Sequence, residues 1–176
     1  PLHALFPDRA EQASPYAPNS RLFLNILYID VTAIPEFPGV DASGLADVVA
    51  AARATELIDY PAVARAKLAG LRVAYDGFRS AASAPRLADF EAYRTEQGDA
   101  LLRFACFEVL RRQRAPVAWR QWPLPWRQAD RTTLNQFRAD NRDECEFQEF
   151  MQWVAARQLH ACQDEARLRG MSIGLY

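Results

Sequence analysis

A long amphipathic helix near the carboxyl terminus is the feature that most limits how this chain can fold. Residues 143–169 carry an apolar stripe at spacings of three and four, formed by Phe147, Phe150, Met151 and Val154. A helix with such a stripe needs other elements to cover it. Gly170 then ends the helix, and the apolar segment 171–176 follows. A strand directly after a helix is typical of a βαβ unit, so we expect a strand of a parallel sheet here, with few partners in this chain.

The rest of the chain is rich in helical patterns and poor in strand patterns. Helical spacing, caps and breaks predict helices over 45–54, 61–78, 86–97, 99–112 and 131–141. Gly98 is expected to kink or divide the third and fourth of these. A short strand is predicted between Arg21 and Ile34, where Pro35 and Pro38 end it. The fold class is therefore mainly α, with one or two short strands near the amino terminus and a terminal strand.

Charge and apolar patterning exclude several classes of partner. The chain has 21 Lys and Arg against 22 Asp and Glu, and Lys67 is its one lysine. A net charge of −1 gives no electrostatic footprint for nucleic acid or an anionic membrane. The cluster Arg111–Arg114 is expected to complement the dipole at the end of a helix. No signal peptide or membrane-spanning run is present in the sequence, and we expect a soluble protein.

The cysteines indicate a reducing compartment rather than a disulfide framework. Cys106, Cys145 and Cys162 form an odd, sparse set, which predicts a cytoplasmic protein with small buried thiols. His160 and Cys162 are two residues apart and point to different helix faces, so no metal site is expected. The sequence has no phosphate-binding or dinucleotide-binding glycine motif, and no cofactor is expected.

Two clusters have both a chemical and a structural interpretation. Carboxylates crowd the start of the last helix, at Asp140, Asp143, Glu144, Glu146 and Glu149. Such groups can act as an acid/base pair on glycosidic bonds, but negative charge is also favourable at a helix start, and we favour a solvated face. The tryptophans Trp119, Trp122 and Trp126 can stack on sugar rings or pack irregular segments, and we favour packing.

The segment from Ser14 to Asp30 differs from the rest in composition. A loop rich in hydroxyl and amide groups, Ser14–Ser20, precedes an apolar run that contains Asn25. Polar side chains on a loop held by a rigid scaffold are typical of a binding site. Turn formation by Ser, Asn and Pro explains the same composition equally well.

These residues resemble those of a known family. The chain is similar to the amylomaltases, bacterial 4-alpha-glucanotransferases of glycoside hydrolase family 77, in four stretches that follow the family's order. They are Ser14-Pro-Tyr-x-x-x-Ser20 with Leu24-Asn25 and Leu27-Tyr-Ile-Asp30, Leu57-Ile-Asp-Tyr-Pro-Ala-Val63, Phe147-Gln-Glu-Phe-Met-Gln-Trp-Val-Ala-x-x-Gln-Leu159, and Gly170-Met-Ser-Ile-Gly-Leu-Tyr176. The segment Trp122–Trp126 matches the family only loosely.

The resemblance implies a fold, an activity and a set of contacts. It implies the helical insertion region of a TIM-barrel enzyme, with a substrate loop and short strand in 1–40, helices in 41–142, and a long helix plus barrel strand in 143–176. The family transfers segments of α-1,4-glucan between maltooligosaccharides with retention, and needs no metal or organic cofactor. Ser14 and Tyr16 are expected to touch sugar, and Asn25 to touch it or to brace the loop.

The resemblance also implies that essential parts lie elsewhere. The family's catalytic carboxylates lie on barrel strands beyond the residues matched here, so no catalytic residue is assigned. We expect a piece of a larger enzyme, inactive alone, that contributes to the glucan groove and associates with the rest of that enzyme or with itself through exposed apolar faces. The rival hypothesis is a free-standing helical interaction domain whose tryptophan segment and arginine cluster bind a partner.

Overall fold

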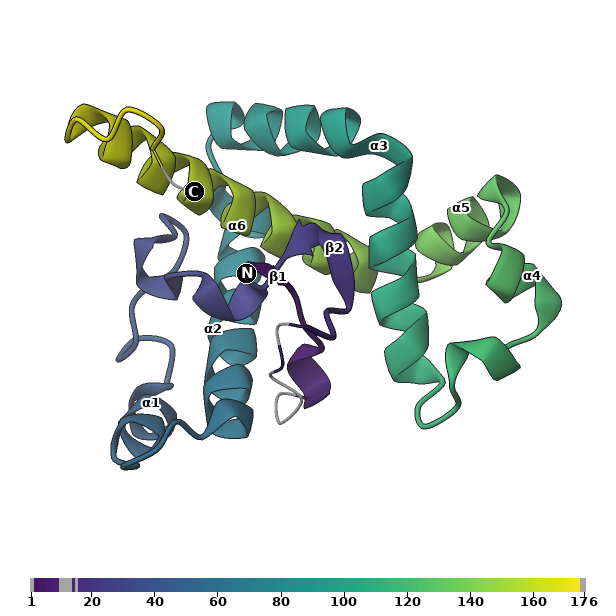
Figure 1. The fold of residues 1–176 in the computed structure, drawn as a ribbon, viewed down its shortest axis with the longest axis horizontal. Helices are drawn as coiled ribbons and strands as arrows, with labels where there is room; N and C mark the ends of the chain where they lie inside the picture. Colours follow the sequence, from purple (N-terminus) through teal and green to yellow (C-terminus); the bar gives the residue numbers. More distant parts are fainter. Residues whose placement is uncertain (1, 10–13, 15, 175–176) are drawn as a thin grey trace. The chain divides into compact units, whose positions relative to one another are not determined.

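The computed structural model describes residues 2–9, 14 and 16–174, and divides them into two compact units. Unit 1 joins the amino-terminal part of the chain, up to Ser83, to the carboxyl-terminal part from Met151. Unit 2 is Ala84–Phe150. The helix α6 (Arg142–Leu168) begins in unit 2 and continues through unit 1, so one element belongs to both cores (Figure 1).

Unit 1 is mainly helical and carries the strands of the described chain. The short strands β1 (His3–Ala4) and β2 (Ser20–Leu24) pair antiparallel. Its other elements are the 3-10 helices η1 (Pro7–Arg9), η2 (Ile26–Tyr28) and η3 (Val31–Ala33), and the α-helices α1 (Ala46–Arg53) and α2 (Tyr60–Ala81). The predicted mainly α class with one or two short amino-terminal strands is confirmed for the described residues.

The helix α2 begins where its sequence signals predicted. The Asp59 carboxylate accepts a hydrogen bond from the Ala62 amide at 2.9 Å, and Pro61 occupies the first turn. Its apolar face is buried, and the Phe78 ring packs against Trp153 of α6 with ring centroids 5.3 Å apart. Trp153 and Tyr75 are completely buried, so they form the centre of unit 1.

Unit 2 is built around a bent helix. The helix α3 (Ala84–Gln113) turns sharply at Gly98, as Figure 1 shows, because Gly98 adopts φ 50° and ψ −125°. Only glycine adopts this conformation readily, which confirms the predicted break. The unit is completed by η4 (Trp119–Gln121), α4 (Leu124–Gln128), α5 (Arg131–Asp140) and the start of α6.

The core of unit 2 contains two of the three cysteines. Cys106 of α3 and Cys145 of α6 are buried in one apolar cluster, as predicted. The neighbouring Cys106 and burial raise the pKa of the Cys145 thiol, so Cys145 stays protonated. Cys162 is exposed, which corrects the expectation of a third buried thiol, because it lies on the solvent side of α6.

The tryptophans of unit 2 mostly pack, as favoured above. Trp122 is buried beside Phe107 at 5.7 Å, and Trp126 lies edge-on to Phe137 at 5.1 Å. Trp119 is half exposed and is the exception. The tryptophan segment is therefore largely internal to unit 2.

The predicted carboxyl-terminal barrel strand is wrong for residues 171–174, and residues 175–176 lie outside the described part of the chain. The Gly174 amide donates to the Met171 carbonyl at 3.0 Å, which closes a turn. Gln163 of α6 donates to the Ile173 carbonyl at 3.3 Å. A parallel strand forms only beside other strands, and the described residues offer none to this segment.

The predicted solvated carboxylate face is wrong for Glu149. Its side chain is 4% exposed and accepts two hydrogen bonds from Arg138, both at 2.9 Å. Arg94 adds a third contact at 2.9 Å. The solvated state was correct for the exposed Asp140 and Asp143, and Glu144 and Glu146 are partly buried, but Glu149 is two turns further along and faces the core side of α6.

Removing the charge of Glu149 is expected to destabilise unit 2. Glu149→Gln leaves two half-buried guanidinium groups without their carboxylate, which costs about 3 kcal/mol of unfolding free energy. The matched control is Glu144→Gln, because the Glu144 side chain is 41% exposed and its contact to Arg112, at 3.2 Å, lies near the surface. That change is expected to cost less than about 1 kcal/mol. Urea unfolding of both variants measures the difference, and equal losses would contradict the buried ion pairs.

Candidate functional site

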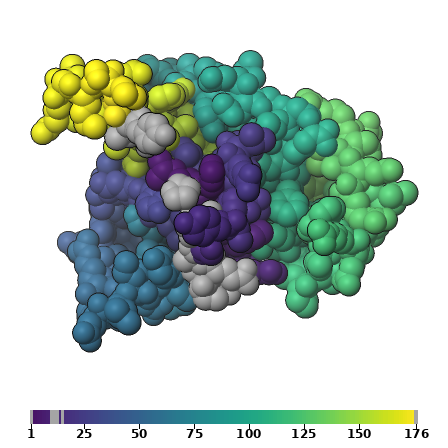
Figure 2. Space-filling model, in the orientation of Figure 1, coloured from purple at the N-terminus to yellow at the C-terminus, as the bar shows by residue number. Residues whose placement is uncertain are grey.

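The loop before β2 presents the residues that the sequence analysis singled out. Ser14 is exposed, and Tyr16 has 89% of its surface accessible. The Ala17 amide donates to the Ser14 carbonyl at 3.3 Å, so the loop closes a turn around these residues. Figure 2 shows the purple amino-terminal segment on the surface of the viewed face. A tyrosine exposed to this degree contributes little to a core and is available to a ligand.

Asn25 lies just after β2 and is the N-cap residue of η2. Its side-chain oxygen accepts a hydrogen bond from the Leu27 amide at 3.1 Å, which caps η2. The residue is 8% exposed. Bracing of the turn is thus visible in the structure, whereas a contact between Asn25 and sugar stays a prediction.

The strand β1 brings the end of this loop close to Asn25. The Asn19 amide donates to the Ala4 carbonyl at 2.7 Å, and the Asn25 amide donates to the Leu2 carbonyl at 2.9 Å. Two acceptors that are two residues apart on a strand lie about 7 Å from each other. The pairing of β1 with β2 shifts in register between His3 and Ala4, so β2 bulges out between these two hydrogen bonds. The structure therefore gathers both ends of β2 at one place.

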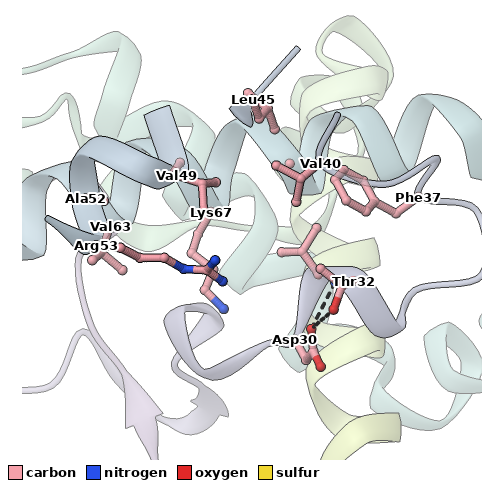
Figure 3. A pocket seen from close by; sticks show the side chains of 13 residues that line it. Asp30, Thr32, Phe37, Val40, Leu45, Val49, Ala52, Arg53, Val63 and Lys67 are labelled. Carbon is pink, nitrogen blue, oxygen red and sulfur yellow. Dashed lines mark hydrogen bonds between the residues drawn. The ribbon is translucent and has the colours of Figure 1, made fainter. Parts of the chain in front are cut away.

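A cavity of about 430 Å³ adjoins the segment that follows η2 (Figure 3). Apolar side chains form most of its wall, among them Phe37, Val40, Leu45, Val49 and Val63. Its charged groups come from Asp30, from Arg53 at the end of α1, and from Lys67 of α2. The sequence analysis did not find this pocket, because residues from four separate segments line it.

Two charged groups of this pocket, Asp30 and Lys67, have shifted pKa values. Thr32 donates both its hydroxyl, at 2.6 Å, and its amide, at 2.9 Å, to the Asp30 carboxylate, and these bonds hold the pKa of Asp30 below its usual value. Burial lowers the pKa of Lys67, and the charge of Asp30 opposes this shift in part. The Lys67 ammonium donates to the Ile29 carbonyl. Lys67 thus ties α2 to the segment after Asn25.

The carboxyl groups with shifted pKa values do not suit acid catalysis. Hydrogen bonds from Thr32, Arg103 and Thr133 hold the pKa values of Asp30, Asp99 and Asp130, respectively, below the ordinary range. A general acid on a glycosidic bond needs the opposite shift. The described residues also contain no group of three metal-ligating side chains. What the site offers is hydroxyl, amide and aromatic contact surface rather than reacting groups.

Comparison with known proteins decides the family. A family model described as 4-alpha-glucanotransferase, glycoside hydrolase family 77, matches residues 1–175. The chain belongs to this family. The rival hypothesis of an unrelated interaction domain is therefore wrong, and its arginine cluster is not a free surface, since Arg111 is buried in an ion pair with Glu108 at 2.9 Å.

Relatives agree over the whole chain. The 4-alpha-glucanotransferase of Haemophilus influenzae is 27% identical over 100% of this chain and 28% of its own length. That of Mycobacterium tuberculosis is 33% identical over 99% of this chain and 25% of its own length. The crystal structure of amylomaltase from Corynebacterium glutamicum matches with a TM-score of 0.70 and 29% identity, covering 98% of this chain and 23% of that one. The chain thus spans about a quarter of the length of these family members.

Two further findings concern the helices and the packing units of the described residues. None of the helices in the described part of the chain is long and apolar enough to cross a lipid bilayer. The two packing units do not coincide with the predicted segments 1–40, 41–142 and 143–176, which describe places in a barrel rather than cores of this chain. That division stays a prediction.

Lys67 is expected to titrate below the usual lysine value of 10.5, since burial disfavours its charged form. Because it is the one lysine, labelling with ¹³C-lysine yields a single side-chain signal whose shift against pH gives the pKa directly. Asp30→Asn removes the opposing charge and should lower the pKa further, whereas Asp47→Asn on the exposed face of α1 should leave it unchanged.

The lowered pKa of Lys67 makes the stability of the fold depend on pH. Between the folded and unfolded pKa values of Lys67 the unfolded chain binds more protons, so stability should rise with pH through that window. A Lys67 titration at or above 10.5 would contradict the burial of this group.

Proposed function

We propose that the chain is a glucan-holding part of a 4-alpha-glucanotransferase, an enzyme that transfers α-1,4-glucan segments between maltooligosaccharides with retention. The match of the family model to residues 1–175 is the observation that carries this proposal. In the whole enzyme the chain forms the helical insertion of a TIM barrel and one wall of the substrate groove. The catalytic carboxylates lie outside this chain, so the chain alone transfers no glucan.

The sugar contacts are assigned to the loop before β2. The exposed Tyr16 ring offers a flat apolar surface for the face of a pyranose ring, and its hydroxyl offers a polar edge. The Ser14 hydroxyl can both donate to and accept from sugar hydroxyls. Asn25 supports the turn that follows through its side-chain oxygen, and its side-chain nitrogen is the group that would donate to a sugar oxygen.

Two further features support a location and a partner surface for the chain. The sparse, unpaired cysteines support a cytoplasmic location, where thiols stay reduced. The exposed apolar side chains Leu22, Tyr28, Leu57, Ile58 and Ile173 of unit 1 form surface that the rest of the enzyme covers. In the isolated chain the same surface favours self-association.

Binding of maltoheptaose to the 176-residue chain tests the sugar contacts. Tyr16→Ala is expected to weaken binding about fivefold, because loss of an aromatic contact costs on the order of 1 kcal/mol. Tyr60→Ala is the matched control, since Tyr60 is also an exposed tyrosine of unit 1 but lies at the start of α2. Calorimetric titration measures both, and equal affinities for the two variants would contradict the assignment.

The activity itself is tested with maltotriose. The isolated chain is expected to release no glucose from maltotriose, while the full-length product of the gene that encodes it disproportionates this sugar. Glucose release by the 176-residue chain would overturn the placement of the catalytic groups outside it. Failure of both proteins would overturn the proposed function.

A further inference from the structure

Two glutamines of α6 hold the backbone of the segment that follows β2. The Gln152 side chain accepts a hydrogen bond from the Leu24 amide at 2.9 Å and donates one to the Leu24 carbonyl at 3.0 Å. The Gln158 side chain does the same for Asp30, at 2.8 Å and 2.7 Å. Each glutamine therefore satisfies both backbone groups of one residue, as a neighbouring strand would.

Only a primary amide can make this pair of bonds with a side chain of this length. Glutamine carries an acceptor oxygen and a donor nitrogen on one planar group, whereas glutamate has only acceptors and methionine neither a comparable donor nor acceptor. Gln152 is 2% exposed, so water cannot replace its hydrogen bonds to Leu24 if they are lost. These contacts are consequently sensitive to the chemistry of the side chain rather than to its bulk.

The spacing of the two glutamines determines the conformation of the segment. Gln152 and Gln158 are six residues apart, and so are Leu24 and Asp30. Six residues of α-helix rise about 9 Å, whereas six residues of extended chain would cover about 20 Å. The segment has to be compact to meet both anchors, which explains why β2 ends at Leu24 and the 3-10 helix η2 follows it.

Neighbouring bonds add to the same restraint. The Lys67 ammonium donates to the Ile29 carbonyl from α2. Asn25 and Asp30 cap η2 and η3 with their own side chains. Tyr28 lies between the two glutamine anchors and remains 65% exposed, so the bonds order the backbone without burying this side chain.

We propose that Gln152 and Gln158 are positioning residues for glucan binding: their side-chain amides order residues 24–30, and with them Asn25 and the loop that carries Ser14 and Tyr16, before the sugar arrives. This rests on the proposed function for the identity of the ligand. The link to the loop is the amino-terminal segment, in which the Ala4 carbonyl of β1 accepts from the Asn19 amide and the Leu2 carbonyl, just before β1, accepts from the Asn25 amide. A segment that is already ordered loses less conformational entropy when the ligand binds. The glutamines therefore increase the affinity for sugar without contacting it.

Three variants of the 176-residue chain test the proposal. Gln152→Met and Gln158→Met keep the approximate size of the side chain and remove both hydrogen bonds. Gln158→Glu keeps size and one acceptor but turns a carboxylate oxygen toward the Asp30 carbonyl. Gln163→Met is the matched control, because Gln163 lies on the same helix but bonds the Ile173 carbonyl instead. Circular dichroism and thermal unfolding establish that each variant folds.

Amide hydrogen exchange reports on the contacts themselves. The Leu24 amide in Gln152→Met, and the Asp30 amide in both Gln158 variants, are expected to exchange at least tenfold faster than in the unaltered chain. The amides of Phe78 and Tyr75 in α2 should keep their protection, and Gln163→Met should change neither Leu24 nor Asp30. Unprotected Leu24 and Asp30 amides in the unaltered chain would overturn the proposal at once. Should Gln152→Met unfold the chain, the partly exposed Gln158 still tests it.

Maltoheptaose affinity reports on the positioning role. The Gln152 and Gln158 variants are expected to bind three- to tenfold more weakly, with Gln158→Glu no better than Gln158→Met, while Gln163→Met binds as the unaltered chain does. Faster exchange with unchanged affinity would overturn the positioning role and leave the proposed function standing. An unaltered chain that protects both amides but binds no maltoheptaose would overturn the proposed glucan contacts and the positioning role with them.

Discussion

An irregular segment packed against a helix cannot obtain hydrogen bonds from the backbone of that helix, because the helix has already used its own amides and carbonyls. This constraint governs unit 1. Backbone groups of Leu24, Asp30 and Ile29 are bonded to the side chains of Gln152 and Gln158 of α6 and of Lys67 of α2, respectively. The apolar contacts of Trp153 and Phe78 hold the two helices in the same unit. The candidate sugar-binding loop depends on all of these, since β1 connects it to the ordered segment.

In unit 2 a buried polar group is satisfied by ion pairs instead of by side-chain amides. Glu149 is buried on α6 and is satisfied by Arg94 and Arg138, which come from α3 and α5. One carboxylate thus links three helices, while the apolar cluster around Cys106, Cys145 and Trp122 fills the space between them. A cavity of about 360 Å³ borders these groups, but the ion pairs already occupy their charges, so we assign it no role.

Much of the secondary structure was predictable from local patterns. The apolar stripe of α6, the Asp59 cap with Pro61, and the break at Gly98 each act over a few residues, and all three were identified correctly. The short strand expected between Arg21 and Ile34 is present as β2, but its end at Leu24 was not predictable, because the segment after it is bonded to glutamines 128 residues away. The solvated state expected for Glu149 was wrong for the same kind of reason, since Arg94 lies on another helix. Periodicity predicts elements, but it does not predict which distant side chain will satisfy a buried polar group.

In the candidate site, too, some residues could be identified from the sequence and others only from the structure. Ser14 and Tyr16 could be named from the sequence because the resemblance to the family is local there. The roles of Gln152 and Gln158 could not, although both lie in a stretch that also resembles the family, because a motif does not say what an amide bonds to. Lys67 was noted for its rarity, and only the structure connects it to Ile29.

The central claim is that side chains of α6, in the place of a neighbouring strand, hold the segment after β2. NMR scalar coupling across the hydrogen bond, between the Leu24 amide nitrogen and the side-chain carbonyl carbon of Gln152, tests it most directly. The account predicts a measurable coupling for this pair and for Asp30 with Gln158. Side-chain amides of both glutamines that rotate freely in water, with no coupling to either residue, would contradict it.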